Sequence, residues 1–325
     1  MSAFRRLGNS GLTVSTVGLG CNNLGRTGTP TEGARGATTL VNAAVDAGIT
    51  FFDVADSYGK TAGLSEELLG KGLGRNRDDV VVATKFGMDL RGANGADWNA
   101  RGSRRYIVKA AEASLRRLNT DWIDLYQFHT PDPGTPIDET LAALDDLVSS
   151  GKVRYIGHSN RTGWQIAEAE FTARMSGYTR FISAQNHYNL LDRRAELEVI
   201  PAAEAYGLGV LPYFPLANGL LTGKYQDGKA PAGSRLSHSR QNLLEAADWD
   251  QLKQFSSFAA ARDLSEVEVA FSWLAAQPAV ASVIAGATKP EQVKMNVEAA
   301  SWQPGAQDLE ELDRIFPQTP KTALF

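Results

Sequence analysis

Residues 123–157, IDLYQFHTPDPGTPIDETLAALDDLVSSGKVRYIG, contain the pattern that decides the fold. The short apolar run Ile123–Phe128 predicts a buried strand, and apolar residues at helical spacing predict a helix over Ile137–Ser149 that stops near Gly151. Another short apolar run, Tyr155–Gly157, follows directly. A strand, a helix and a second strand joined by short connections are typical of a βαβ unit, whose strands run parallel.

The same alternation extends over most of the chain, after a segment, Phe4–Val14, that predicts a hairpin. Strands are expected at Val17–Leu19, Thr50–Asp53, Val80–Thr84, Ile123–Phe128, Tyr155–Gly157, Ile182–Gln185, Gly209–Tyr213 and Ser282–Ala285. Helices are expected at Thr38–Ala47, Ser103–Leu118, Ile137–Ser149, Trp164–Met175, Leu197–Tyr206, Leu252–Arg262, Glu266–Ala276, Pro290–Ala300 and Leu309–Phe316. Eight βα units without a Pro/Ser/Gly-rich linker favour a closed (β/α)₈ TIM barrel over an open doubly wound sheet. We expect one barrel domain over residues 1–325.

Composition excludes several classes of protein. Hydrophobic residues at 43% and charged residues at 22% are typical of an ordinary globular domain, and a net charge of -4 gives no basic field for nucleic acid. Cys21 is the only cysteine, so an intramolecular disulfide is excluded. Neither a secretory signal nor a membrane span is expected. We expect a cytoplasmic protein without a membrane partner, either a monomer or a homo-oligomer.

Common cofactor and metal motifs fail when they are tested residue by residue. The segment Gly18–Asn23 has asparagine where a dinucleotide-binding G-x-G-x-x-G motif needs its third glycine. The segment Gly219–Tyr225 is one residue too short for a phosphate loop and ends in tyrosine instead of serine or threonine. The four histidines have no metal-ligand spacing, so no metal site is expected.

Polar side chains stand at the C-terminal ends of the predicted strands. They are Asp53 at the second strand, Lys85 after the third, His129 after the fourth, Ser159 and Asn160 after the fifth, and Gln185 at the sixth. In a barrel these ends converge, so the set predicts a catalytic mouth. The alternative is a polar network that only closes the barrel.

The residues around this mouth resemble the aldo-keto reductase signature. The resemblance rests on FFDVADSYG (51–59) and SEELLG (65–70), and it continues through ATK (83–85), DLYQFH (124–129), IGHSN (156–160), Gln185-Asn186 and residues 213–225. It covers nearly the full length, and the cofactor loops are similar to those of the potassium-channel β-subunit branch. The resemblance implies an NADPH-dependent oxidoreductase that reduces aldehyde or ketone carbonyls to alcohols.

The resemblance and the chemistry together assign four catalytic residues, Tyr58, Lys85, Asp53 and His129. A carbonyl oxygen that gains negative charge needs a proton, and Tyr58 is the expected donor. Lys85 is expected to lower the pKa of that phenol, and Asp53 to keep Lys85 charged. His129 is expected to orient the substrate oxygen.

The cofactor expected from the resemblance is NADPH rather than NADH. Its nicotinamide carboxamide is assigned to Ser159, Asn160 and Gln185, and Tyr213 is expected to stack on the ring. A long segment, Leu216–Asp248, is interpreted as a cofactor clamp, with a surface insertion as the alternative. The remaining contacts assigned to the cofactor are Cys21, Asn22, Asp53, Phe214, Leu216, Lys224, Arg235, Gly286, Thr288, Gln292 and Asn296.

The chain departs from the family pattern in three places, one of them a pair of neighbouring residues. Met295 stands where a carboxylate is frequent, Phe214 where serine is common, and Cys21-Asn22 where Thr-Trp is often found. Asn22, Met88 and Trp98 are expected to shape the pocket for a small-molecule carbonyl substrate; the alternative for Trp98 is that it packs on its own barrel. The alternative function is a redox-sensing regulatory subunit like the channel β-subunits. That branch carries asparagine where this chain has His129, so the histidine favours an active reductase.

Overall fold

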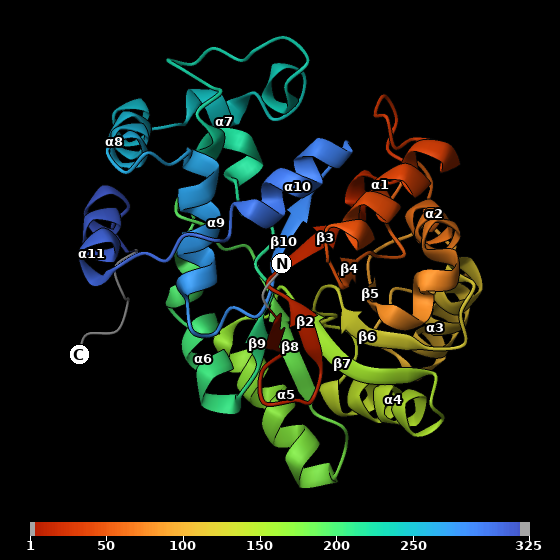
Figure 1. Cartoon of the computed structure of the whole chain (residues 1–325). Helices are drawn as coiled ribbons and strands as arrows, with labels where there is room; N and C mark the ends of the chain where they lie inside the picture. The colour runs from red at the N-terminus through yellow and green to blue at the C-terminus, as the bar shows by residue number, and fades with distance from the viewer. Residues whose placement is uncertain (1–3, 319–325) are drawn as a thin grey trace.

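The computed structural model describes residues 4–318 of the chain. Its centre is a sheet of eight parallel strands in the order β10, β3, β4, β5, β6, β7, β8, β9. The strands are β3 (Val17–Gly20), β4 (Phe51–Asp53), β5 (Val81–Phe86), β6 (Ile123–Phe128), β7 (Val153–Ser159), β8 (Phe181–Gln185), β9 (Gly209–Val210) and β10 (Val283–Gly286). The edges meet, because Val210 pairs with Val280 and the Ile284 N–H donates to the Pro212 carbonyl at 3.0 Å. The predicted (β/α)₈ barrel is confirmed (Figure 1).

The expected hairpin is present and closes one end of the barrel. It consists of β1 (Phe4–Arg6) and β2 (Thr13–Ser15), which pair antiparallel. Leu7 and Val14 are fully buried in the same cluster as Phe51 and Leu125 of the strands. The Asn9 N–H donates to the Gly207 carbonyl, just before β9, so the hairpin lies at the N-terminal ends of the strands. The C-terminal ends, which carry the predicted site, form the opposite mouth.

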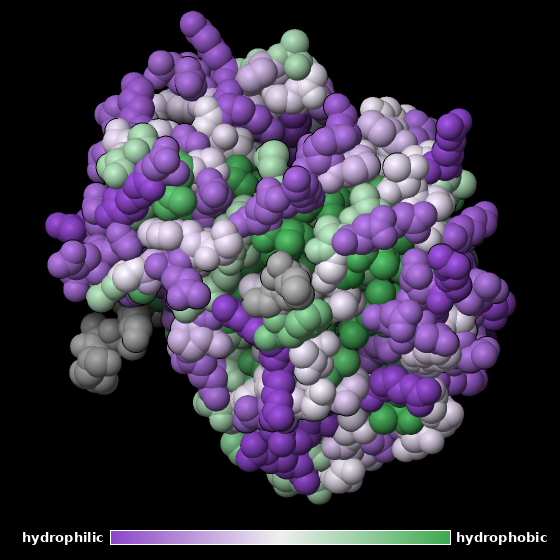
Figure 2. Space-filling view, in the orientation of Figure 1, coloured by the Kyte–Doolittle hydropathy of each residue, from purple (hydrophilic) through white to green (hydrophobic). Residues whose placement is uncertain are grey.

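Helices surround the sheet (Figure 1). They are α1 (Ala34–Asp46), α2 (Leu64–Leu73), α3 (Arg104–Leu118), α4 (Ile137–Ser149), α5 (Gly163–Ser176), α6 (Val199–Tyr206), α7 (Asn242–Glu245), α8 (Trp249–Ala260), α9 (Glu266–Ala276), α10 (Pro290–Glu298) and α11 (Ala306–Ile315). In α1 the buried residues are Ala37, Leu40, Val41 and Ala44, the i, i+3, i+4, i+7 spacing of one helix face. On the face of the molecule shown in Figure 2, hydrophilic residues cover much of the surface.

Several predicted boundaries need correction. Lys85 was expected after its strand, but it lies inside β5, which runs to Phe86. Strand β9 ends at Val210 instead of Tyr213, because Pro212 has no N–H to continue the ladder, although Tyr213 still bridges to His187. Helix α1 begins four residues before the predicted Thr38.

Helix α2 is not among the predicted helices, because glycine in its interior disfavours a helix in isolation. The fold requires these glycines. A Cβ at Gly70 would lie 2.3 Å from the Leu118 carbonyl oxygen, and a Cβ at Gly72 would lie 3.0 Å from the Val41 side chain. Close packing of α2 on α3 and α1 therefore outweighs local propensity.

The long segment Leu216–Asp248 is more ordered than its composition predicts. It contains the short 3-10 turns η4 (Ala217–Thr222) and η5 (Arg235–Ser237) and the single-turn helix α7. Its Leu236 is fully buried, and the Leu236 N–H donates to the Tyr225 hydroxyl at 3.1 Å. Figure 1 shows this segment projecting beside α8 and α9. Within residues 4–318, no helix combines the length and the apolar character needed to cross a membrane.

Candidate active site

Asp53 and Lys85 form a buried ion pair at the mouth of the barrel. The β4–β5 register places Asp53 opposite Ala83, and Lys85, two residues further along β5, points to the same side as Ala83. The Lys85 Nζ donates to the Asp53 carboxylate at 2.8 Å and to the Val54 carbonyl at 2.9 Å. Lys85 is fully buried and Asp53 is 3% exposed. The two charges therefore compensate each other inside the barrel.

Two glutamine amides complete the surroundings of Asp53. The Gln185 Nε2 donates to Asp53 Oδ1 at 2.8 Å, and the Gln127 Nε2 donates to the same oxygen at 3.2 Å. Gln127 was not predicted as a site residue, although it lies within the DLYQFH motif and pairs in register with Lys85. Gln185 was assigned to the nicotinamide, and here its amide nitrogen is bonded to Asp53. Both glutamines hold the carboxylate in place.

Tyr58 lies next to this pair, with its hydroxyl 3.4 Å from Lys85 Nζ. Burial raises the pKa of Tyr58, and the charge of Lys85 offsets this only in part. The net direction is opposite to the expected one, because loss of water outweighs the ammonium. Burial alone would lower the pKa of Lys85, but Asp53 and Tyr58 raise it above its ordinary value. The phenol therefore keeps its proton beside a charged ammonium.

The loop that carries Tyr58 is held by main-chain hydrogen bonds. The Tyr58 N–H donates to the Ala55 carbonyl at 3.1 Å, and the Ser65 N–H donates to the Tyr58 carbonyl at 3.2 Å. The Ser65 hydroxyl donates to the Cys21 carbonyl at 2.6 Å. Gly59 has φ of +107°, which favours glycine, so the chain turns sharply after Tyr58.

His129 packs edge-on against Tyr58, with ring centroids 5.8 Å apart. Its backbone N–H donates to the Phe86 carbonyl at 2.8 Å, which places the ring at the end of β6. Burial and the nearby Lys85 lower the pKa of His129 to about 3. Its Nδ1 is buried and finds no hydrogen-bond partner among residues 4–318. The imidazole is therefore neutral at physiological pH, which the sequence did not reveal.

Ser159, Asn160 and Gln185 lie together, as expected for one binding site. The Ser159 hydroxyl donates to the Gln185 carbonyl at 2.7 Å, and the Asn160 Nδ2 donates to Ser159 Oγ at 3.0 Å and to the His129 carbonyl at 3.0 Å. The Asn160 Oδ1 accepts from the Tyr213 hydroxyl at 2.8 Å. These bonds join the end of β7 to His129 and Tyr213.

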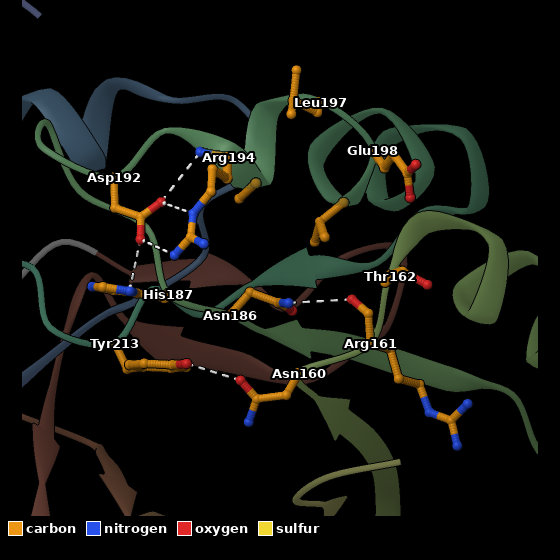
Figure 3. A pocket seen from close by; sticks show the side chains of 12 residues that line it. Asn160, Arg161, Thr162, Asn186, His187, Asp192, Arg194, Leu197, Glu198 and Tyr213 are labelled. Atoms are coloured by element: carbon orange, nitrogen blue, oxygen red, sulfur yellow. Dashed lines mark hydrogen bonds and ion pairs between the residues drawn. The ribbon is translucent and has the colours of Figure 1, made fainter. Parts of the chain in front are cut away.

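A pocket of about 590 Å³ opens beside Asn160 and Tyr213 (Figure 3). The Tyr213 ring stacks on His187 with centroids 5.4 Å apart and an interplanar angle of 6°. The His187 Nδ1 lies 2.9 Å from Asp192, which also pairs with Arg194 at 2.6 Å. One face of Tyr213 is thus fixed by a polar chain that the sequence did not indicate.

A cluster of arginines surrounds Phe214. The Arg235 guanidinium lies 5.5 Å from the Phe214 ring centroid, and that of Arg240 lies 5.3 Å from it. Burial lowers the pKa of Arg235, and the charges of Arg26 and Arg240 lower it further. Within residues 4–318, none of these three arginines forms an ion pair with an acidic side chain. Arg26 and Arg240 were not predicted; only the fold brings them to Arg235.

The other predicted contacts lie around the same mouth, in different states of exposure. Lys224 is exposed, with its Nζ 5.1 Å from the Tyr225 ring centroid, while Asn296 is 7% exposed. The Thr288 N–H donates to Gln292 Oε1 at 2.8 Å. Leu216 and Asn22 are partly buried, whereas Gly286 and Met295 are exposed.

Two further residues depart from the expected picture of the mouth. Cys21 is 1% exposed, its thiol contacts the Leu19 carbonyl at 3.5 Å and its own carbonyl accepts from Ser65, so the residue is not open to a ligand. Burial raises the pKa of that thiol. Trp98 is 63% exposed and stacks under Arg105, with the guanidinium 4.0 Å from the ring centroid. Its contact with α3 fits packing on the barrel's own surface.

Comparison with known proteins agrees with this geometry. The model of the aldo/keto reductase family matches residues 16–316. The chain belongs to the aldo/keto reductase family, a family of oxidoreductases. It is 39% identical to the "uncharacterized oxidoreductase YrpG" of Bacillus subtilis, covering 96% of this chain and 95% of that protein.

Other relatives of this aldo/keto reductase chain have different printed names. It is 34% identical to a "probable voltage-gated potassium channel subunit beta" of Oryza sativa subsp. japonica, covering 98% of each chain. It is 33% identical to the "L-glyceraldehyde 3-phosphate reductase" of Escherichia coli, covering 91% of this chain and 87% of that protein. Family membership therefore leaves the individual substrate open.

Aldo/keto reductases typically use NAD(P)H, and the residues present fit such a group. The mouth offers amide and hydroxyl groups for a carboxamide, and the flat ring of Tyr213 lies beside them. The arginines around Phe214 supply positive charge without acidic partners, which suits phosphate groups.

Proposed function

We propose that this chain reduces aldehyde or ketone carbonyls to alcohols with NADPH, using Tyr58 as the proton donor, and that one barrel domain over residues 1–325 does so. The observation that carries the proposal is the position of the Tyr58 hydroxyl, 3.4 Å from a fully buried Lys85 that is itself paired with Asp53. This arrangement presents a proton and a compensating positive charge at the same place.

The four residues divide the work of proton transfer. As the carbonyl oxygen gains an electron pair it takes the proton from the Tyr58 O–H bond, and the phenolate that remains is stabilised by the Lys85 ammonium. Asp53 keeps that ammonium charged in a buried site. A neutral His129 beside Tyr58 is suited to donate a hydrogen bond to the substrate oxygen without adding charge.

Bound NADPH supplies the hydride that reaches the carbonyl carbon. Ser159, Asn160 and Gln185 would hold the carboxamide, and Tyr213 would pack on the ring. The arginines Arg235, Arg240 and Arg26 favour the extra phosphate of NADPH over NADH, because they bring three positive charges without an acid between them. The substrate is a small molecule, and the single buried cysteine supports a reducing, cytoplasmic location.

The test is turnover of a reactive aldehyde, 4-nitrobenzaldehyde, followed by the loss of NADPH absorbance. Tyr58→Phe removes the proton and leaves the ring, so kcat should fall by about 10²- to 10⁴-fold, the usual contribution of a general acid. Quenching of NADPH fluorescence should give an unchanged Kd. Full turnover by Tyr58→Phe would sink the mechanism.

A second candidate function, an NADP(H)-binding redox-sensing regulatory subunit with weak turnover, is favoured by relatives named as channel β subunits. The same assay separates the two functions. Wild-type protein that binds NADPH but reduces none of a panel of aldehydes, ketones and sugar derivatives would support the regulatory role.

A further inference from the structure

A second buried polar network lies behind the Tyr58 loop. The Asn94 Nδ2 donates to Asp56 Oδ2 at 3.0 Å, and the Asn94 Oδ1 accepts from Arg117 at 2.9 Å. The Arg117 Nε donates to Glu66 at 2.6 Å, and Thr84 donates to the other Glu66 oxygen at 2.5 Å. Asp56, Glu66 and Thr84 are fully buried and Asn94 is 8% exposed. The network joins the Tyr58 loop, α2, β5 and α3.

A count of charges shows that Asp56 is the neutral member. The network holds two carboxyl groups but a single cation, and Arg117 makes its ion pair with Glu66. Asp56 Oδ1 has no hydrogen-bond partner in the part of the chain that the structure describes, and a buried carboxylate oxygen without a donor is costly. Burial first and then the charge of Glu66 raise the pKa of Asp56 well above its ordinary value. Burial and the neighbouring Glu66 therefore favour the neutral form of Asp56, and its Oδ2 accepts the hydrogen bond from Asn94.

Asp56 and Asn94 connect two segments of the barrel mouth. Asp56 stands two residues before Tyr58, and its N–H donates to the Lys85 carbonyl at 3.2 Å. Asn94 belongs to the loop Gly87–Ser103, which follows β5 at the mouth of the barrel. Asn94 is the only buried residue in the stretch 91–100. Asn94 is therefore the point at which this loop is buried, and its side chain is hydrogen-bonded to Asp56 in the segment that carries Tyr58.

We propose that Asp56 and Asn94 are positioning residues: their hydrogen bond anchors the loop Gly87–Ser103 to the Tyr58 segment and so sets the substrate side of the mouth. This inference rests on the proposed function. A protein whose loop is detached should bind NADPH normally, because the cofactor contacts come from other loops. It should bind the carbonyl substrate less well, because one wall of the mouth is no longer fixed.

The main test is Asn94→Ala, measured with NADPH and 4-nitrobenzaldehyde. The change leaves Asp56 Oδ2 and one Arg117 nitrogen without partners, so KM should rise about tenfold, as loss of a buried hydrogen bond predicts. We expect kcat to stay within about threefold and the Kd for NADPH to be unchanged. Asp56→Ala removes the bond to Asn94 but leaves the Asn94–Arg117 bond, so it should raise KM by a similar or smaller factor. The double variant should match Asn94→Ala, because that variant has already lost the Asp56–Asn94 bond. Ala93→Ser, at the exposed neighbouring position, is the matched control and should match wild type.

A second pair of variants decides the case even if Asn94→Ala does not fold. Asp56→Asn keeps an acceptor for Asn94 and replaces a neutral acid with a neutral amide, so its KM should stay within about threefold of wild type. The inference is overturned if Asp56→Asn is as damaging as Asp56→Ala, or if Asn94→Ala lowers only Tm and leaves KM unchanged. If wild type and Ala93→Ser both fail to reduce the aldehyde, it is the proposed function that fails.

Discussion

The two sides of the barrel mouth hold their charges in different ways. On the inner side, the Lys85 ammonium is fully buried and bonded to Asp53, and two glutamines satisfy the same carboxylate. On the outer side, Arg235 and Arg240 pack on Phe214 and have no acidic partner within the described chain. The first arrangement is complete without a ligand, whereas the second has positive charge left to bind one. The inner groups are therefore fixed by their own contacts, whereas the unpaired positive charge of the outer side suits an anion.

The largest expected effect comes from breaking the inner pair. Lys85→Met leaves a buried carboxylate without its cation, so the free energy of unfolding should fall by about 3–5 kcal/mol, and turnover should be lost. Urea unfolding followed by circular dichroism measures the first effect. The control is Lys253→Met, which breaks the exposed Lys253–Asp227 pair and should change stability by less than about 1 kcal/mol. If the free energy of unfolding falls equally in both variants, burial does not make the Lys85–Asp53 pair more important for stability than an exposed pair.

An intermediate effect is expected on the outer side. Arg235→Ala and Arg240→Ala should each raise the Kd for NADPH about tenfold or more, because a charge-assisted hydrogen bond contributes about 1.5–3 kcal/mol. The Kd for NADH should change less, since it lacks the extra phosphate. Fluorescence titration with both nucleotides measures the difference, and Arg35→Ala, on the exposed face of α1, is the control. An equal rise in the Kd for NADPH and for NADH would show that the arginines contact a group that both nucleotides contain.

The smallest effect concerns pH and the neutral His129. Its folded-state pKa, about 3, lies below the ordinary value of 6.5, so the unfolded chain binds the proton more readily between these values. Stability from this residue is therefore present above pH 6.5 and is lost as the pH falls toward 3. Between pH 7 and pH 5, wild type should lose about 1–2 kcal/mol more than His129→Asn does. Thermal unfolding across this range measures the slopes, and identical slopes would show that His129 titrates normally in the fold.

The barrel itself was predictable because each strand and helix has a local pattern. Apolar runs such as Ile123–Phe128 and the helical spacing over Ile137–Ser149 are recognisable without any knowledge of the fold, and both elements occur with these bounds. The errors lie where packing outweighs local preference. Helix α2 contains glycines at the points where Leu118 and Val41 pack against it, and β9 ends two residues before Pro212. Such effects depend on neighbours that are distant in sequence.

The candidate site was predictable in its residue types but not in its internal bonds. Tyr58, Lys85, Asp53 and His129 lie together, as the strand order and the family motif indicated. The only sequence signal for Gln127 was its position near the C-terminal end of a predicted strand, one residue before Phe128. Side chains alternate along a strand, so Gln127 and Phe128 point to opposite faces. Arg26 joins Arg235 from a loop about two hundred residues earlier, and no local pattern marks that approach.

The sequence by itself determined the βα repeat, the family and the types of polar residue around the barrel mouth, because periodicity and motifs are properties of neighbouring residues. Only the tertiary structure decided which of these groups are charged. Burial raises the pKa of Tyr58 and lowers that of His129, and burial together with the charge of Glu66 raises the pKa of Asp56. Protonation depends on the loss of water and on charges that folding brings close together, and neither can be determined from the sequence alone.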